Sequence, residues 1–260
     1  MPNATEFCKD LARSLAFLSR LPMPSRAFVG HDGSMARSCR AFPLAGFVAA
    51  LGPAVLLYAA SGPATGLLAA FLSLAALTLV TGALHEDGLA DCADGLFGGR
   101  DRAHALSIMK DSRVGSYGVV ALVLAFGLRA SALMAIAATA GAGLAAAALL
   151  AAAAFSRALM VWHWADLPPA RTDGTAAGAG RPLAAAMRIA LGLGAALSLV
   201  LLPAGAPLVP VVLALLAAGL AALLFTRFVS RSIGGHTGDT IGATQQITET
   251  TLLCALAVLL

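Results

Sequence analysis

Residues 85–118 read HEDGLADCADGLFGGRDRAHALSIMKDSRVGSYG and hold six of the thirteen acidic residues of an otherwise apolar chain. Asp87, Asp91 and Asp94 follow one another at i, i+4 and i+7, a spacing that puts three carboxylates on one face of a helix. Like charges at this spacing repel by roughly 0.2–0.5 kcal/mol, so we expect a hard divalent cation to offset them. Magnesium fits, because it takes oxygen ligands and is commonly shared with substrate phosphates. The alternative interpretation is a solvated acidic loop between two hydrophobic segments.

Composition indicates that the rest of the chain lies in a membrane. Of the 260 residues, 59% are hydrophobic and 12% are charged, whereas a soluble domain carries roughly 25% charged residues. We therefore predict an all-α fold, a polytopic transmembrane helix bundle formed by a single integral membrane domain over residues 1–260. The net charge of +4 is spread along the chain, which argues against a nucleic-acid partner. The four cysteines are scattered, which argues against a zinc site or a disulfide framework.

The hydrophobic segments predict about seven spans, since about 20 apolar residues cross a bilayer. They lie at 42–60, 64–84, 117–140, 142–165, 186–203, 207–228 and 247–260. The last segment is short, so it either begins earlier or crosses only part of the bilayer. Before them, residues 4–21 place apolar side chains at helical spacing with basic residues among them, which predicts an N-terminal amphipathic helix. That helix lies either in the membrane interface, with its cations toward lipid headgroups, or against the bundle.

The loop charges divide the connections between spans into two groups. Three connections carry no charge: 61–63, 141 and 203–207. All other charges outside the spans lie in four segments: 1–40, 85–116, 166–188 and 227–246. Because lysine and arginine are retained on the cytoplasmic side, we expect these four segments to face the cytoplasm and to meet at one membrane face.

Two arginines fall inside predicted spans. Arg129 is too deep for easy snorkelling, so we expect it to face the bundle interior and to pair with an acid. Arg157 lies closer to the cytoplasmic end of its span and either snorkels, pairs or reaches a ligand. Trp162, His163 and Trp164, near the same end, fit an aromatic belt.

A second polar segment, RSIGGHTGDTIGATQQITE at 231–249, is rich in glycine. Such a loop allows backbone amides to approach a phosphate closely. Together with the acidic face it indicates phosphoryl or phosphodiester transfer, in which Lys110 and Arg113 would add fixed positive charge. An acidic residue would take the proton of an attacking alcohol. Asp111 is the first candidate and Asp239 the second, and Asp111 is also a candidate metal ligand.

The run HEDGLADCADGLFGG followed by IMKDSRVGSYG closely resembles the cobalamin synthases, which are adenosylcobinamide-GDP ribazoletransferases. FLSRLPMP at 17–24, FPLAG at 42–46 and GGHTGDTIGA at 234–243 extend the resemblance over nearly the whole chain. The resemblance implies a magnesium-dependent enzyme of the cell inner membrane with its active site facing the cytoplasm. α-Ribazole, or α-ribazole phosphate, would attack adenosylcobinamide-GDP, GMP would leave, and adenosylcobalamin or its phosphate would form.

The resemblance also points to individual site residues and partners. The candidate metal ligands are Asp87, Asp91, Asp94 and Asp111. The resemblance gives Lys110, Ser112, Arg113, Thr237 and Gly238 as candidate substrate-binding residues, and position in the chain adds Arg157, inside a span, and Glu86 and His236, beside the motifs. Glu86 ranks below the three aspartates because it lies about 100° around the helix from Asp87. Besides the two substrates, the expected partners are membrane lipid and, left open, a second copy of the chain.

Two other functions stay open. The CDP-alcohol phosphotransferases, which make phospholipids, have an aspartate motif that opens similarly, but their characteristic A-R is Ala90-Asp91 here. A membrane transporter would line its path with Arg129 and Arg157. The acids gather at one face, however, and the spans show no inverted repeat, which argues against a transporter.

Overall fold

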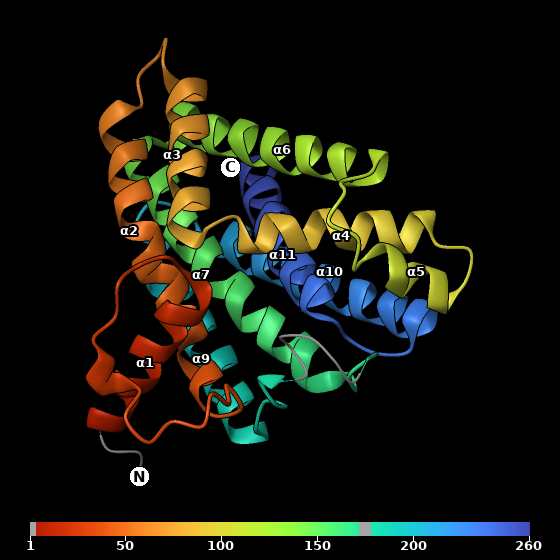
Figure 1. The fold of residues 1–260 in the computed structure, drawn as a ribbon. Helices are drawn as coiled ribbons and strands as arrows, with labels where there is room; N and C mark the ends of the chain where they lie inside the picture. The colour runs from red at the N-terminus through yellow and green to blue at the C-terminus, as the bar shows by residue number, and fades with distance from the viewer. Residues whose placement is uncertain (1–3, 172–177) are drawn as a thin grey trace.

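The computed structural model of the protein describes residues 4–171 and 178–260, so part of the predicted loop at 166–188 lies outside the described residues. That part of the chain contains helices and no strand, which confirms the all-α fold. The helices are α1 (Ala4–Leu18), α2 (Phe42–Ala60), α3 (Gly66–Thr81), α4 (Leu84–Gly98), α5 (Arg102–Ile108), α6 (Ser116–Ala140), α7 (Ala142–Asp166), α9 (Ala184–Leu201), α10 (Leu208–Ile233) and α11 (Gly238–Leu259) (Figure 1). Two short 3-10 helices, η1 (Ser25–Ala27) and η2 (Ser38–Ala41), follow α1.

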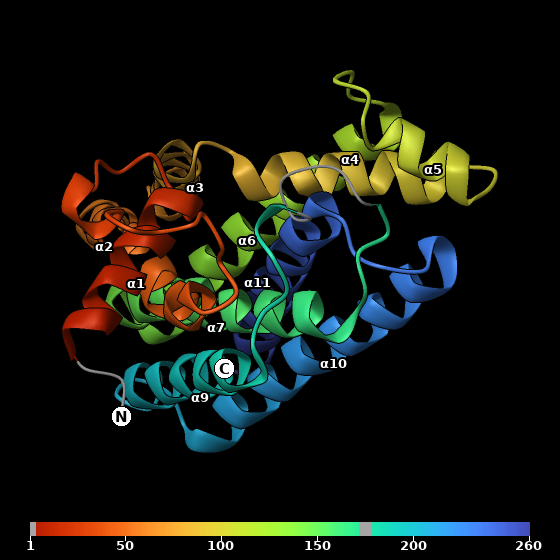
Figure 2. The same cartoon turned by 60° about the horizontal axis from the view of Figure 1, so that its bottom comes forward.

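Helix α7 forms the centre of the bundle. It packs against α2, α6, α9, α10 and α11 (Figures 1 and 2). Of the apolar stretch of α7 that is long enough to span a membrane, 83% is buried, whereas only 22–33% of the corresponding stretches of α6, α9 and α10 is buried. Its first half is mostly alanine, and such small side chains let neighbouring helix backbones approach closely in a membrane. The other long helices expose large apolar side chains outward, as lipid-facing helices do.

Five helices of the described chain are long and apolar enough to span a membrane, and α3 with α4 would make a sixth if they formed one broken span. The five are α2 (extended back to Ser38), α6, α7, α9 and α10. The expected number of about seven is therefore too high. The second predicted span is interrupted before its end, and the seventh is only the second half of a longer, more polar helix.

The second predicted span stops at Gly82 and Ala83, where the chain turns by 93° from α3 into α4. Both residues have positive φ, 65° and 58°, and Ala83 is the one non-glycine residue with positive φ in the described chain. The turn gives a carbonyl in the last turn of α3 a hydrogen-bond partner, since Ala83 N donates to Thr78 O at 2.9 Å. As a result α4 packs against α6 and α11 (Figure 1) and does not continue along α3.

The seventh predicted span is the second half of α11, which begins nine residues earlier than expected, at Gly238. Its first half is polar but buried against α4, α7 and α10. The buried polar side chains are Thr240, Thr244, Gln245, Gln246, Thr248 and Glu249. Hydropathy alone could not assign this helix, because its polar face is turned toward the protein and its apolar residues are few before Leu252.

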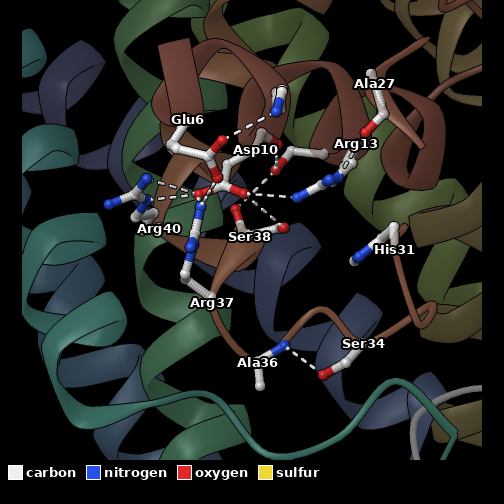
Figure 3. A network of polar contacts seen from close by, with 12 residues as sticks. Glu6, Asp10, Arg13, Ala27, His31, Ser34, Ala36, Arg37, Ser38 and Arg40 are labelled. Atoms are coloured by element: carbon white, nitrogen blue, oxygen red, sulfur yellow. Dashed lines mark hydrogen bonds and ion pairs between the residues drawn. The ribbon is translucent and has the colours of Figure 1, made fainter. Parts of the chain in front are cut away.

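Of the two positions left open for the N-terminal helix, the structure supports the one against the bundle. Helix α1 packs on α2 and η2. Its Asp10 is fully buried and is surrounded by basic side chains (Figure 3): Arg40 Nη2 lies 2.7 Å, Arg37 Nε 3.2 Å and Arg13 Nη1 3.3 Å from its carboxylate. Ser38 also donates to Asp10, at 3.0 Å. These contacts join α1 to the segment that leads into α2.

Candidate active site

The site is built where α4 crosses α11. A Cβ atom added at Gly88 would lie 3.0 Å from the carbonyl oxygen of Asp239 and 3.3 Å from Cα of Gly242. The two backbones are therefore in direct contact, and only residues without a side chain allow this approach. The crossing brings the acidic helix and the glycine-rich segment together, as the sequence predicted, and it excludes the alternative of a solvated acidic loop.

A cavity of about 200 Å³ lies at this crossing, between α1, α2, α4, α7 and α11. Asp87 of α4 and Asp239 of α11 both line it. The remaining lining is mainly apolar and aromatic: Phe17, Leu18, Phe42, Leu84, His85, Gly88, Met160, Trp164, Gly238, Ile241 and Gly242. An apolar cavity with a few convergent polar groups is the usual form of a small-molecule site.

Among the described residues around this cavity, carboxylates outnumber cations. Asp91 is partly buried and feels the like charges of Asp87, Asp94 and Asp239. Asp239 has one cationic partner, Arg171, whose Nη2 lies 3.3 Å from Oδ2. Thr237 Oγ1 donates to the same oxygen at 3.0 Å. Burial raises the pKa of Asp239 above its usual range, although Arg171 and Thr237 oppose this shift.

The first turn of α11 fixes the position of Asp239. Thr237 caps the helix: its side chain accepts a bond from the backbone N–H of Thr240, and Thr240 Oγ1 accepts one from Thr237 N. Gly238 lines the cavity. His236 is buried, and its backbone pairs with Pro168 and Ala170 on the other side of the site. Thr237 and His236 thus shape the loop, whereas Gly238 and Asp239 face the cavity.

Arg102 of α5 ties three predicted cytoplasmic segments together. Its Nε donates to Ile233 O at 2.7 Å and its Nη2 donates to Ala170 O at 2.8 Å. The acidic segment, the segment after α7 and the glycine-rich segment are therefore one assembly. The fourth segment joins them through Phe17 and Leu18, which line the cavity.

Asp94 has a different role from its two neighbours on α4. It is buried and caps the start of α6, since Oδ2 accepts a bond from Gly115 N at 2.6 Å and Oδ1 accepts one from Gly118 N at 2.9 Å. A carboxylate at a helix N-terminus accepts hydrogen bonds from otherwise unpaired backbone amides and interacts favourably with the helix dipole. In the described chain no three His, Cys, Asp or Glu side chains stand in a metal-holding arrangement. Asp87, Asp91, Asp94 and Asp111 therefore do not form a preassembled cage.

The connection between α5 and α6 carries Lys110, Asp111, Ser112 and Arg113, and in Figure 2 it projects above α4, while α11 lies below α4. Asp111 forms a two-pronged ion pair with Arg113, with Nη2 2.6 Å from Oδ2. The hydrogen bonds from Arg113 lower the pKa of Asp111 to about 2. Asp111 is therefore paired with a cation of its own connection.

Glu86 and Arg157, both candidate substrate residues, lie in a buried network inside the bundle. Arg157 is 1% exposed, and its Nη1 lies 3.9 Å from Glu249, so of the alternatives left open for it, snorkelling is excluded and pairing is supported. Arg129 donates to Glu249 at 2.9 Å, which confirms that it faces inward and pairs. Glu86 lies 3.8 Å from Arg129 and accepts a bond from Gln246 at 3.1 Å. Two arginines and two glutamates balance one another here.

The aromatic belt predicted at the end of α7 is wrong for two of its three residues. Trp164 is 2% exposed and lines the cavity. His163 is fully buried, with Nδ1 2.8 Å from Thr226 Oγ1 and Nε2 3.1 Å from Thr240 Oγ1. Sequence reasoning also missed Arg171, the partner of Asp239, because no local pattern marks it.

Comparison with known proteins adds a family to this geometry. A family model described as cobalamin-5-phosphate synthase matches residues 10–257. Two proteins named adenosylcobinamide-GDP ribazoletransferase, from Sinorhizobium medicae and Rhizobium meliloti, are 57% and 55% identical to the chain over 99% of both chains. One of the same name from Brucella anthropi is 45% identical over 96% of this chain and 97% of its own. No solved structure matches the chain.

These matches decide between the functions that the sequence left open. They favour neither a phospholipid-forming transferase nor a transporter. The family model includes α4, the connection between α5 and α6, and the whole glycine-rich segment, so it covers every element that builds the site. This chain therefore belongs to the cobalamin-5-phosphate synthase family of enzymes.

Proposed function

We propose that the protein joins α-ribazole, or α-ribazole phosphate, to adenosylcobinamide-GDP and releases GMP, forming adenosylcobalamin or its phosphate. The name of the relatives supplies the two substrates. The observation that carries the proposal is the cavity at which Asp87 of α4 meets Asp239 of α11. Transfer between a diphosphate and an alcohol needs carboxylates for two purposes, to hold a cation and to accept a proton.

Magnesium is the cofactor that fits this site. The donors are carboxylate oxygens in excess over nearby cations, and Mg²⁺ prefers such oxygens. Mg²⁺ is usually held by one or two carboxylates and completed by water and substrate phosphates, which suits a site without a preassembled cage. We assign Asp87 and Asp91 to the ion, because both oxygens of Asp94 already accept backbone bonds. Bound there, the ion would neutralise charge on the diphosphate.

Asp239 is the residue that we assign to proton transfer. It lines the cavity, and Arg171 and Thr237 both contact its Oδ2, so its orientation is fixed. The primary hydroxyl of α-ribazole would bond to the cobinamide-linked phosphorus as its proton passes to Asp239, and the bond from that phosphorus to the GMP oxygen would break. Asp111 is less suitable as the base, because its pairing with Arg113 keeps its pKa low.

The basic connection between α5 and α6 is assigned to the phosphates. Gly115, at its end, contacts Asp94, which lies one turn of α4 beyond Asp91. The contact between Gly115 and Asp94 thus anchors the connection to the acidic helix, where a diphosphate would extend from the metal. Lys110, Ser112 and Arg113 lie on the connection just before this anchor. Fixed positive charge there would stabilise the charge that develops on the leaving GMP.

We place the protein in the cell inner membrane with this site on the cytoplasmic side. The charged segments that meet at the site and the uncharged connections elsewhere support this orientation. The exposed apolar side chains of α2, α3, α6 and α10 support lipid as the surrounding partner.

The test is a turnover assay with purified protein in detergent. We expect GMP release that requires both adenosylcobinamide-GDP and α-ribazole, stops in excess chelator and returns with magnesium. A CDP-linked lipid in place of adenosylcobinamide-GDP is the control and should give no product. Full activity in chelator would contradict the metal assignment, and turnover of the CDP-linked lipid alone would contradict the substrate assignment.

A further inference from the structure

A polar contact holds α4 to α11 just beyond the point where Gly88 meets Gly242. On α11, Asp239 lies one turn before Gly242 and Gln246 lies one turn after it, on the same face of the helix. Gln246 Nε2 donates to Glu86 Oε1 of α4 at 3.1 Å. The close backbone contact therefore has the carboxylate of Asp239 on one side and a hydrogen bond between the two helices on the other.

Glu86 joins α4 to two further helices through the same carboxylate oxygen. Thr78 of α3 donates to Oε1 at 3.4 Å, and Arg129 Nη2 of α6 lies 3.8 Å from it. Glu86 is 6% exposed, Gln246 2% and Arg129 1%, and none of them is among the described residues that line the cavity. These side chains are therefore placed to hold helices together and not to touch a substrate.

The hydrogen bond between Glu86 and Gln246 fixes a degree of freedom that the glycine contact leaves open. Two helices that touch through glycine have no interlocking side chains at that point, so they can turn about it. Apolar packing is non-directional, whereas a hydrogen bond weakens steeply as its angle departs from linear. Stability alone explains the buried charges poorly, because replacing a buried ion pair by apolar residues is often neutral or stabilising.

We infer that Glu86 and Gln246 are positioning residues, whose bond sets the angle between α4 and α11 and thereby the separation of Asp87 and Asp239. Asp87 follows Glu86 directly on α4, and Asp239 precedes Gln246 by two turns on α11. Without the bond, each aspartate stays on its own helix and moves relative to the other. The roles of the two aspartates are those of the proposed function, on which this inference rests.

The kinetic test compares Gln246→Met with Ser156→Ala. Methionine keeps the length of the side chain and removes the donor. Ser156→Ala removes another buried bond of α11, since Gln245 Nε2 lies 3.0 Å from Ser156 Oγ of α7. Both variants should lower the melting temperature. Only Gln246→Met should also lower kcat, by roughly 10–100-fold at an unchanged KM for both substrates, because a misplacement of about 1 Å costs up to about 10²-fold. An unchanged kcat in folded Gln246→Met, or an equal loss in Ser156→Ala, would overturn the inference.

A double-mutant cycle tests whether Gln246 acts through Asp239. In an Asp239→Asn protein the proposed proton acceptor is already absent, so its position no longer matters. Adding Gln246→Met should then lower kcat by less than about twofold further. The same loss as in the wild-type background would show an independent structural role and would overturn the inference.

Exchanging the two partners tests the bond itself. Gln246→Glu alone sets two carboxylates against each other and should lower kcat at least as much as Gln246→Met. Adding Glu86→Gln restores a donor and an acceptor at the same two positions with the net charge of the wild-type protein, and it should recover most of the kcat. No recovery in the folded double variant would overturn the inference.

A distance measurement separates this inference from the proposed function. Spin labels carried by Phe97→Cys of α4 and Val258→Cys of α11, both exposed positions, report the angle between the helices once the two cysteines that are not buried are replaced by alanine. In Gln246→Met the distance between the labels should shift or broaden by about 2 Å or more, because a displacement of about 1 Å at the site is amplified at the ends of rigid helices. Ser156→Ala should leave the distance unchanged.

The distance can be read whether or not the protein turns over its proposed substrates. An unchanged distance in Gln246→Met would overturn the inference even if the enzyme releases GMP. A shifted distance in a protein that releases no GMP would support the role of the bond and contradict the proposed function.

Discussion

Two clusters of acidic side chains, one around Asp10 and one at the cavity, differ in how they are neutralised. Around Asp10, which is fully buried, Arg13, Arg37 and Arg40 all lie within 3.3 Å of the carboxylate (Figure 3). At the cavity, Arg171 contacts Asp239, whereas Asp91 feels the like charges of Asp87 and Asp239. The fold therefore supplies cations where a carboxylate has a structural role and leaves them out at the site. We propose that a metal ion brings the missing positive charge, and we expect stability and activity to depend on different acids.

The largest effect is expected from neutralising the acids of the cavity. Asp87→Asn and Asp239→Asn should each lower kcat by roughly 10³-fold, since one removes the proposed metal ligand and the other the proposed proton acceptor. The melting temperature should stay the same or rise, because like-charge repulsion is relieved. GMP release and thermal unfolding of the purified variants measure both quantities. A kcat near that of wild type in either variant would contradict the role assigned to that residue.

The opposite pattern is expected at the N-terminal cluster. Asp10→Ala leaves three arginines without their shared partner, and loss of one member of a buried ion pair costs about 3–5 kcal/mol. The free energy of unfolding should fall by that amount, while molecules that remain folded keep their kcat. Glu6→Ala is the control: its pairs with Lys9 and Arg37 are partly exposed, so its cost should stay below about 1 kcal/mol. Equal destabilisation by both variants would contradict the account.

Asp94 separates the two roles of the acids. Its spacing in the sequence places it on the acidic face, whereas in the structure it caps α6. Asp94→Ala should cost roughly 1–2 kcal/mol of stability through loss of the cap on α6, with a smaller loss of kcat than in Asp87→Asn. Thermal unfolding and GMP release again provide the two values. If instead Asp94→Ala abolished turnover at an unchanged melting temperature, Asp94 would be a metal ligand, as its spacing alone predicts.

The smallest effect is expected at Asp111, the exposed acid paired with Arg113. Its pKa in the folded protein is lowered to about 2, so the stability it contributes is present at neutral pH and is lost only as the pH falls below about 4 toward that value. Because the pair with Arg113 is exposed and screened by solvent, Asp111→Asn should lower the melting temperature only slightly, by the same amount throughout pH 5 to 9, and alter kcat less than about threefold. A loss of kcat as large as in Asp239→Asn would make Asp111 the base.

Much of this arrangement could be predicted from the sequence, and each miss has its own physical cause. The acidic helix, the glycine-rich segment beside it and the inward pairing of Arg129 follow from spacing and from the cost of a charge in a membrane. The inward orientation of Trp164 could not be predicted, because lipid and protein interior are equally apolar and hydropathy does not distinguish them. The cap formed by Asp94 depends on Gly115 and Gly118, more than twenty residues away, which no local pattern reveals.

The break between α3 and α4 was missed for a different reason. Gly82 is a common helix end, but Ala83 adopts a left-handed conformation that its side chain disfavours. Only the packing of α4 against α6 and α11 makes this turn favourable, and such contacts are invisible in the local sequence.

The most direct test of the central claim is metal binding itself. Manganese, which can replace magnesium at oxygen sites, can be titrated into the purified wild-type, Asp87→Asn and Asp10→Ala proteins in the presence of adenosylcobinamide-GDP and followed by electron paramagnetic resonance. The account predicts saturable binding in the wild-type and Asp10→Ala proteins and at least tenfold weaker binding in Asp87→Asn. Equal manganese affinity in all three proteins would contradict it.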